Sequence, residues 1–407
     1  MNRREVKRAP VLRFKGFTND WEQQSLKKIF TTITDYVANG SFASLRHNVK
    51  TYKKPNYAYL IRLMDASNNW NGPWLFTDKK GYDFLSKSSL KPKDILLSNV
   101  GAGVGKTFQV PRLDKPMTLA PNAILLRSNK LNNQFCFYLL KYPQNKNKVL
   151  SLVGVSAQPK LNKTDFGRLI FNIPNDRSEQ DKISKILSKL DKIVNLQQRK
   201  LKDIQLLKKA YLKAIFKSNK STYKLKDIAD YRRGSFPQPY GNPKWYGGDG
   251  SLPFVQVIDV AKNLRLYNST KQRISRLAQS KSVFVPKGSI LITLQGSIGK
   301  VAITQYDAFV DRTLLIISNL KKDVDKYYFA YALQDKFNEE KRKAPGGTIK
   351  TITKNALSEF QIKLPKKDIQ KKQSSILQKI DKDIYIINLK LSELSKFKQF
   401  LLQNMFI

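Results

Sequence analysis

The chain has few of the residues on which catalysis and metal binding most often depend. Its 407 residues include one histidine, His47, and one cysteine, Cys136. A zinc cluster or a cysteine–histidine nucleophile needs more ligands and bases than these two distant residues provide. A single cysteine also excludes an internal disulfide and indicates a reducing compartment. We therefore expect no metal site and no nucleophilic catalysis in this chain.

Long apolar runs are also missing from the sequence. No run reaches the roughly 18 to 20 residues that a membrane-spanning helix requires. The basic start MNRREVKRAP is not followed by the apolar stretch of a signal peptide. These two absences predict a cytoplasmic protein without a membrane partner.

Acidic residues are scarce relative to basic ones. The chain has 31 Asp and Glu against 75 Lys and Arg, which gives a formal net charge of +44. Such an excess favours a nucleic-acid partner. The hydrophobic content of 41% is enough for packed cores, and the length indicates two or three domains.

Motifs for chemistry on nucleotides or DNA are incomplete. Gly101–Thr107 resembles a phosphate-binding loop, but Val100 stands where that motif needs its first glycine. Asn242–Trp245 lacks the second proline of the DNA amino-methyltransferase motif. Glu339 and Glu340 lie in a charged segment that is typical of a solvated helix face. We therefore expect no ATP binding, methyl transfer or DNA cleavage by the chain itself.

One long stretch occurs twice in the chain. Residues Pro174–Phe216 contain ILSKLDK, and Pro365–Phe406 contain ILQKIDK 190 residues later. Neither copy contains Gly or Pro after Gln180 or Gln370, so each can form one helix of about 60 Å at 1.5 Å per residue.

Both copies have apolar residues every three or four positions, which is typical of a coiled-coil seam. Each helix is too long to bury this stripe alone, so we expect the two copies to pack against each other, with Gln197 helping to fix their register. The alternative is that each is a core helix of its own domain. The expected seam residues include Leu187, Leu190, Val194, Leu201, Leu207, Leu377, Ile380, Ile384, Leu391 and Phe397.

The rest of the chain repeats as well, with small changes of offset. The strand-like run Leu60–Asp65 matches Phe254–Asp259 at 194 residues, and Phe137 matches Phe329 at 192. The chain is therefore a tandem duplication of a globular module followed by a long helix.

Each module combines expected strands with expected helices. Buried strands are predicted from apolar, β-branched runs bounded by turn residues, and helices from longer periodic segments. The strands are Asp94–Val100, Ala123–Leu126, Ser289–Leu294 and Leu314–Ile317, and the helices are Gln134–Tyr142 and Lys326–Lys341. We predict an α+β fold in which two tandem mixed modules are separated by two long antiparallel coiled-coil helices, with a pseudo-two-fold internal repeat.

Basic residues are interleaved with aromatic residues in both modules. The first module has this mixture between Arg46 and Tyr57, and the second between Arg232 and Tyr246. Such mixtures suit phosphate anchoring together with base-edge contacts. The alternative is that the aromatics are core residues and the lysines are merely solvated. Lys106 and Lys300, in the paired glycine turns, are open to phosphate contact or to purely structural use. The candidate DNA-binding residues are Arg46, Lys50, Lys53, Lys54, Asn99, Lys106, Gln158, Lys160, Arg232, Arg233, Gln238, Lys244, Gln295, Lys300 and Lys350.

The whole chain resembles the DNA-specificity subunit of a type I restriction-modification enzyme. The resemblance is carried by VLRFKGFTNDWEQQSL, the paired PKDILLSNVGAGVGK and PKGSILITLQGSIGK, the paired SAQPKLNKTDF and GTIKTITKNAL, and the two helices that follow FNIP and IKLP. It implies target-recognition domains at residues 1–173 and 218–364, with spacer helices at 174–217 and 365–407. Ile349 stands where the first module has Gln158, and Trp21 has no counterpart, so the two modules differ.

The resemblance also implies partners. Each module would read one half of a bipartite site in double-stranded DNA, and the helices would dock two methyltransferase subunits, with restriction and translocase subunits joining them. S-adenosylmethionine, ATP and magnesium would bind to those partners and not to this chain. The alternatives are a freestanding basic architectural protein that binds nucleic acid by charge alone, and a recognition subunit that serves another effector enzyme.

Overall fold

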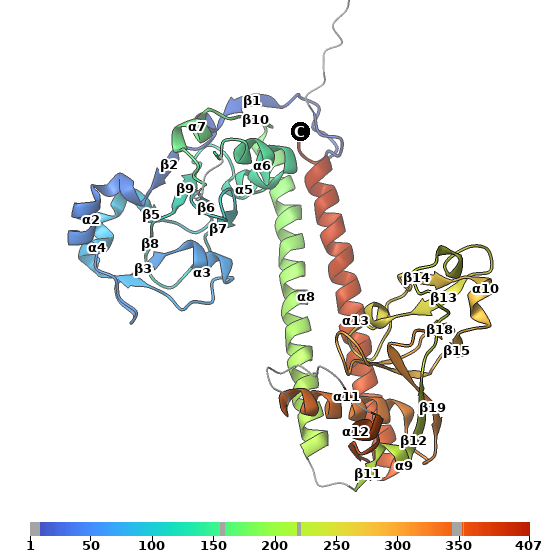
Figure 1. Ribbon diagram of the computed structural model, residues 1–407. Coiled ribbons are helices and arrows are strands. Elements are labelled where there is room, and N and C mark those ends of the chain that lie inside the picture. Colours follow the sequence, from blue (N-terminus) through green and yellow to red (C-terminus); the bar gives the residue numbers. More distant parts are fainter. Residues whose placement is uncertain (1–8, 155–158, 218–220, 344–351, 353) are drawn as a thin grey trace, which may run out of the picture. The chain divides into compact units, whose positions relative to one another are not determined.

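The chain forms two compact units. The computed structural model describes residues 9–154, 159–217, 221–343, 352 and 354–407 (Figure 1). Unit 1 comprises Met1–Gln197 and Lys390–Ile407, and unit 2 comprises Gln198–Leu389. Each unit contains one globular module and a part of both long helices, α8 (Arg177–Lys217) and α13 (Lys367–Asn404).

The module of unit 1 contains three small sheets. Two have four strands each and one has two strands, with only β3 and β8 paired in parallel in the described part of the module. The first sheet has the order β2 (Thr32–Asp35), β9 (Ala123–Arg127), β6 (Ile95–Ser98), β7 (Thr107–Gln109); the second has β4 (Phe76–Thr77), β3 (Ala58–Ile61), β8 (Met117–Leu119), β5 (Ser89–Leu90); the third pairs β1 (Glu22–Ser25) with β10 (Ile170–Ile173).

The module of unit 2 has the same three sheets in the same strand order. The parallel pair is again in the middle of the second sheet, between β13 and β18. The sheets are β12 (Ala229–Arg233), β19 (Leu314–Leu320), β16 (Ile290–Thr293), β17 (Val301–Ile303); then β14 (Gln272–Ile274), β13 (Leu252–Val255), β18 (Ala308–Val310), β15 (Val283–Val285); then β11 (Thr222–Lys224) with β20 (Gln361–Lys363). The predicted duplication and mixed fold are confirmed.

Short helices connect the strands. Those of the first module are α1 (Leu26–Ile29), η1 (Tyr36–Asn39), α2 (Phe42–Asn48), α3 (Leu63–Ser67), α4 (Lys79–Phe84), η2 (Ser86–Ser88), α5 (Asn133–Lys141), α6 (Pro143–Leu150) and α7 (Lys163–Arg168). Those of the second are α9 (Leu225–Ile228), η3 (Pro243–Trp245), η4 (Val257–Asp259), α10 (Arg276–Gln279), α11 (Lys326–Lys343) and α12 (Lys354–Ser358).

The strand predicted at Leu60–Asp65 is too long, because the chain turns after Ile61. Asp65 lies in α3, and its carboxylate accepts from the backbone N–H of Arg62 at 2.9 Å. Asp259 accepts from the N–H of Gln256 at 2.8 Å in the equivalent place. A carboxylate that bonds the N–H three residues earlier stabilises the first turn of a helix, so the repeated aspartate ends the strand.

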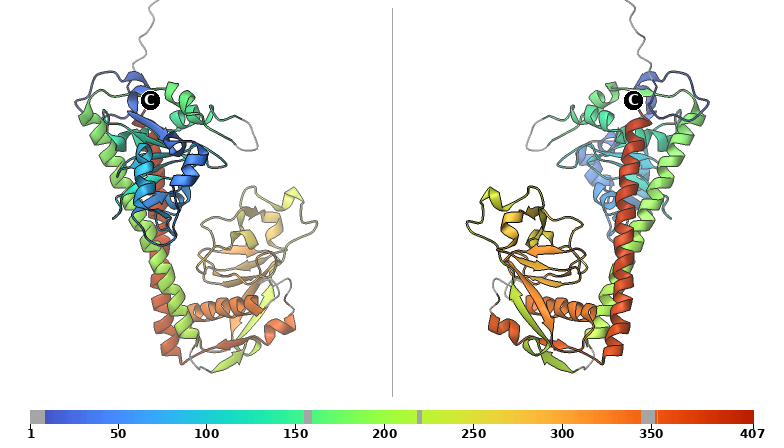
Figure 2. Two further views of the ribbon diagram at one scale, coloured as in Figure 1. Left: turned by 90° about the vertical axis from the view of Figure 1, so that its left-hand side faces the viewer. Right: turned by 90° about the vertical axis from the view of Figure 1, so that its right-hand side faces the viewer.

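In unit 1, the beginning of α8 and the end of α13 lie side by side and cover one face of the module (Figures 1 and 2). Leu187 and Leu190 of α8 and Leu401 of α13 join the same core as Phe135 of α5. Burial of each such side chain contributes about 2 kcal/mol. The first module is therefore attached to both long helices by its main core.

In unit 2 the roles of the two helices are exchanged. The end of α8, with Ile215 and Phe216, and the beginning of α13, with Leu377, share a core with α11. The pairing of early α8 with late α13 in unit 1, and of late α8 with early α13 in unit 2, confirms the antiparallel packing. Of the predicted seam residues, Ile384 is buried, whereas Val194, Leu201, Ile380 and Leu391 are half-buried.

Two predicted seam residues do not lie on the seam. Leu207 is 58% exposed and Phe397 is 49% exposed. The adjacent residues Lys208 and Lys398 occupy the seam positions instead. Both lysines are half-buried and pair with carboxylates of the opposite helix. The expectation of an otherwise apolar seam is therefore wrong. A spacing of three or four residues fits Lys208 as well as Leu207, and Lys398 as well as Phe397, so the spacing did not decide between them.

Candidate nucleic-acid interface

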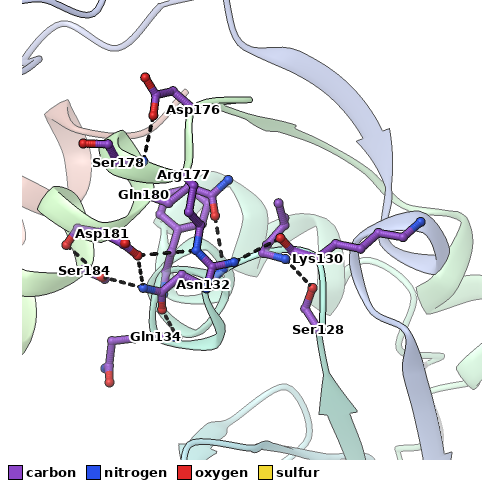
Figure 3. A network of polar contacts seen from close by, with 12 residues as sticks. Ser128, Lys130, Asn132, Gln134, Asp176, Arg177, Ser178, Gln180, Asp181 and Ser184 are labelled. Atoms are coloured by element: carbon purple, nitrogen blue, oxygen red, sulfur yellow. Dashed lines mark hydrogen bonds and ion pairs between the residues drawn. The ribbon is translucent and has the colours of Figure 1, made fainter.

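The first module is fixed to α8 by a polar network around Gln180 (Figure 3). Gln180 Oε1 accepts from the backbone N–H of Asn132 at 3.1 Å, and its Nε2 donates to the carbonyl of Pro174 at 2.9 Å. The side chain of Asn132 caps the N-terminus of α5. One buried amide thus joins the start of α5 to the segment before α8.

The second module repeats this connection with Gln370. Its Oε1 accepts from the N–H of Asp325 at 2.9 Å, and its Nε2 donates to the carbonyl of Pro365 at 2.7 Å. Asp325 in turn accepts from the N–H of Tyr328 at 2.8 Å, as a helix cap. Each module is therefore oriented on its helix by hydrogen bonds of fixed geometry.

Each unit also contains a polar bridge between the long helices and the module, with a buried carboxylate in unit 2 and a half-buried one in unit 1. In unit 2, Lys208 of α8 donates to Asp381 of α13 at 2.5 Å, and the Tyr331 hydroxyl donates to the same carboxylate at 2.6 Å. Burial and the Asp381 charge raise the pKa of Tyr331, so the hydroxyl keeps its proton and remains a donor. We call this group the unit 2 bridge.

The unit 1 bridge consists of the corresponding residues. Lys398 of α13 donates to Asp191 of α8, and the Tyr138 hydroxyl donates to Asp191 at 2.8 Å. The aspartates and the lysines are each 190 residues apart, whereas the tyrosines are 193 apart. The predicted match of Phe137 with Phe329 is therefore one residue out, because the hydrogen bonds align Tyr138 with Tyr331.

The unit 1 core has an additional clamp from the N-terminal segment. Arg13 forms a two-pronged ion pair with the buried Glu179 at 2.7 and 2.9 Å. The ring of Trp21 lies edge-on to Phe135 and to Phe406, with centroids 6.1 Å apart in both cases. Trp21, which has no counterpart in the second module, thus belongs to a contact that is particular to unit 1.

The predicted DNA-binding residues of the first module fall into two groups. Arg46 in α2 and the lysines at positions 50, 53 and 54 are exposed. Asn99, Lys106 and Lys160 belong to a second group, because Val100 pairs with Lys160 in an isolated bridge and the loop that follows β6 returns to β7. Among the described residues, no hydrogen bond or ion pair joins the two groups. Gln158 lies outside the described residues.

Asn99 is the one predicted contact in the first module that is buried. Its backbone N–H donates to the carbonyl of Asn122 at 3.4 Å, and its carbonyl accepts from Leu161 at 2.9 Å. Its side-chain Oδ1 is buried without a hydrogen-bond partner. A buried acceptor without a donor is costly, so this oxygen is a candidate for an external donor at the loop.

The predicted DNA-binding residues of the second module also separate. Arg232 and Arg233 are exposed on β12 and line a cavity of about 300 Å³ with Leu294, next to the exposed Gln295. Gln238 is exposed in the long loop that follows β12, and Lys244 is exposed in η3. Lys350 lies outside the described residues.

Lys300 is placed differently from these residues, because its turn packs on α11. A Cβ atom at Gly299 would lie 2.4 Å from the Phe337 ring. Gln334 accepts from the N–H of Val301 at 3.0 Å and donates to the Gly299 carbonyl at 2.9 Å. These backbone groups are thus engaged with a helix, which supports the structural interpretation of this glycine turn.

The aromatic residues of the second mixture are mostly core residues. Phe236 and Trp245 are buried and share a cluster with Phe254. Tyr240 donates to Asp311 at 3.1 Å, and burial, with a smaller contribution from Asp311, raises the pKa of Tyr240 to about 12. For Phe236 and Trp245 the structure therefore supports the alternative that the aromatics are core residues, and the exposed basic side chains between them remain as candidates.

The few residues considered for chemistry are placed as follows in the described part of the chain. No group of three or more His, Cys, Asp or Glu side chains is placed there to hold a metal ion. Burial raises the pKa of the Cys136 thiol to about 12, which makes it a poor nucleophile. Glu339 and Glu340 both pair with Lys343 on the same helix. In the same ranges, no helix is both long and apolar enough to cross a membrane.

We predict that the unit 2 bridge stabilises the packing of α8 on α13. Replacing Asp381 with Asn leaves the Lys208 ammonium partly buried without a carboxylate, and breaking such a pair costs about 3 kcal/mol. Amide exchange of residues 205–216 should accelerate about a hundredfold. Lys209→Met, which changes an exposed neighbour, is the control. Equal exchange rates in the two variants would contradict the prediction.

Comparison with known proteins identifies the fold. The family described as "Type I restriction modification DNA specificity domain" matches twice, at residues 18–206 and 217–396. A putative type I restriction enzyme specificity subunit of Methanocaldococcus jannaschii is 24% identical over 416 residues, covering 93% of this chain and 91% of the relative. Another type I specificity subunit of the same organism is 30% identical over 164 residues, which cover 39% of this chain and 37% of that relative.

Solved structures have the same architecture. The S subunit of a type I restriction-modification system from M. genitalium superimposes with a TM-score of 0.66 at 15% identity, covering 98% of this chain and 99% of that subunit. A chain from a structural study of complex assembly in the type I system superimposes with a TM-score of 0.50 at 16% identity, covering 95% of this chain and 97% of that one. Since two copies of the domain account for most of the sequence, this chain belongs to the type I restriction-modification DNA specificity family.

Proposed function

We propose that this chain is the subunit that selects the DNA sequence for a type I restriction-modification complex. Each module reads one half of a bipartite site in double-stranded DNA, and the complex methylates or cleaves DNA through partner subunits. S-adenosylmethionine, ATP and magnesium bind to those partners. The observation that carries this proposal is one scaffold, present twice, whose exposed polar positions differ between the copies.

The difference is clearest in the first sheet of each module. The strand pairing places Arg232 and Arg233 of β12 in the positions that Thr34 and Asp35 occupy in β2. Arg232 and Arg233 are exposed and can donate to guanine edges or phosphates. Thr34 is half-buried, and the buried Asp35 accepts from the N–H of Ala38 and pairs with Lys163, so the first module presents no exposed polar group of this kind there. Two copies of a sheet with unlike polar groups at equal positions suit two unlike half-sites.

Exposed apolar residues on the long helices support two equivalent partner sites. Unit 1 exposes Leu196, at 62%, and Phe397, at 49%. Unit 2 exposes Ile386, at 36%, and Leu207, at 58%, which are the repeat equivalents of those two residues. Apolar side chains on an exposed helix face are typical docking positions for another helix. One such pair in each unit supports the binding of two methyltransferase subunits of one kind.

Methylation mapping in cells tests the proposed function. A strain that carries this chain and its partner subunits should methylate a bipartite sequence, and deletion of this chain should abolish methylation at every such site. Methylation that persists at the same sequence without the chain would refute the proposal.

We predict that the purified chain alone binds DNA with a steep dependence on salt and transfers no methyl group. If about six phosphates are contacted, affinity should fall about a thousandfold between 50 and 200 mM salt, because bound counterions are released. Fluorescence anisotropy with a labelled duplex measures the slope, and tritiated S-adenosylmethionine tests methyl transfer. A flat slope, or methylation by the isolated chain, would contradict this prediction.

A further inference from the structure

Unit 2 contains a cleft of about 910 Å³ between the C-terminal part of α8 and one side of α11. Leu212, Tyr331 and Ile384 contribute its apolar lining, and Lys300 and the loop at Ala261–Leu264 border it. This basic cleft shares no lining residue with the cavity at Arg232 and Arg233 described above.

The charge of the basic cleft is strongly one-sided. Eight of its lining residues are Lys or Arg, and only Asp335 and Glu339 are acidic. Glu339 is already engaged by Lys343 at 2.5 Å. Asp335 is a half-buried carboxyl whose pKa is raised by burial. Burial lowers the pKa of Lys341 in α11, and the nearby positive charge of Lys300 lowers it further.

Three of these lysines form a row along α8. Lys209, Lys213 and Lys217 are spaced by four residues, so they lie on one face about 6 Å apart. None of them has an ion pair within the described part of the chain. Like charges at this spacing destabilise a helix slightly. They are tolerated where they bind a ligand of opposite charge.

The internal repeat shows that the fold does not require this row. The equivalent positions hold Gln399 and Gln403 in α13 and Ile407 just after it. The two helices otherwise pack in the same way, with Phe216 and Phe406 in equivalent cores. The lysine row is therefore particular to unit 2, and neither helix packing nor the duplicated scaffold accounts for it.

We propose that the basic cleft binds an acidic segment of a partner polypeptide, with carboxylates on the lysine row and an apolar side chain against the cleft floor. The apolar floor favours this ligand over duplex DNA, whose outer surface offers proteins mainly charged phosphates and sugars. The proposal goes beyond DNA reading by the modules and does not depend on it.

Peptide binding to the full chain tests the proposal. The probe is a fluorescently labelled peptide of four Glu-Glu-Leu-Glu repeats, measured by anisotropy at 150 mM salt. The triple variant K209Q/K213Q/K217Q replaces each lysine of the row with glutamine, the residue that α13 has at two of the three equivalent positions. The control K185Q/K189Q/K192Q removes three exposed lysines of the same helix in unit 1, with the same change of net charge.

The cleft variant should bind the peptide about tenfold more weakly than the parent, and the control less than twofold more weakly. A peptide with Ser in place of Leu should bind the parent several-fold more weakly. Unchanged thermal unfolding midpoints show that both variants remain folded. Equal losses in the two variants, no binding to the parent, or a selective loss of duplex DNA binding in the cleft variant would each overturn the proposal. Since the readout is peptide affinity, its failure leaves the methylation test unaffected.

Discussion

Lengthening both long helices by four residues should widen the gap between the two half-sites by up to about two base pairs. The insertions belong after Arg199 in α8 and after Leu389 in α13, which are repeat equivalents midway between the two bridges. Each insertion adds about 6 Å to its helix, and DNA rises about 3.4 Å per base pair. Four residues are also close to one helical turn, so the seam stays nearly in phase.

The bridges determine how this experiment is designed. Asp191 pairs with Lys398, and Lys208 pairs with Asp381, so the two bridges are equally far apart along both helices. An insertion in α8 alone, for example after Ile204, cannot keep both pairs and serves as the mismatched control. A matched insertion of two residues rotates the seam by about 200° and should abolish assembly.

Sequencing of methylated sites in cells that contain the partner subunits measures the gap for each variant. The half-sites themselves should not change in the matched four-residue variant, because no module residue is altered. An active variant with an unchanged gap would show that the helices do not set the distance between the half-sites.

Exchanging the first module for that of a relative should change one half-site completely and leave the other intact. The exchange covers residues 11–173 with Arg13 and Trp21 retained, because these two side chains pack on Glu179 of α8 and on Phe406, which follows α13. Each module has its own sheets and core, so its surface loops can change without altering the other module.

The readout is again the methylated sequence, now compared base by base with that of the parent. An exchange in which Trp21 is also replaced is the control, since it should lose activity through the core and not through DNA contacts. Altered bases in both half-sites would mean that the two modules read DNA jointly, which the proposed function does not allow.

The family, the duplication and the two long helices were visible in the sequence because each has a local signature. A repeated ILSKLDK and ILQKIDK, apolar residues every three or four positions, and the absence of Gly and Pro all describe neighbours along the chain. The buried strands β6, β9, β16 and β19 were found for the same reason, since short apolar runs between turn residues specify them.

The candidate contacts could be predicted only in part. Side-chain type predicts that Arg232 or Lys53 is exposed, and both are exposed. It does not predict that Phe236 and Trp245 enter a core, or that Lys300 faces a helix instead of a recognition loop. Those outcomes depend on which distant segments share a core, and a mixture of basic and aromatic residues is compatible with either arrangement.

The sequence by itself determined that this protein is a duplicated, basic, two-module chain on two long helices, because charge, periodicity and repetition need no knowledge of contacts. Only the tertiary structure decided which residues fix those helices to each other and to the modules. Asp191 is 207 residues from Lys398 in the chain and 53 from Tyr138. Lys398 takes the seam position instead of the adjacent Phe397 because the half-buried Asp191 carboxylate lies across the seam. This carboxylate stabilises the nearby ammonium, whereas an apolar side chain would leave its charge unpaired.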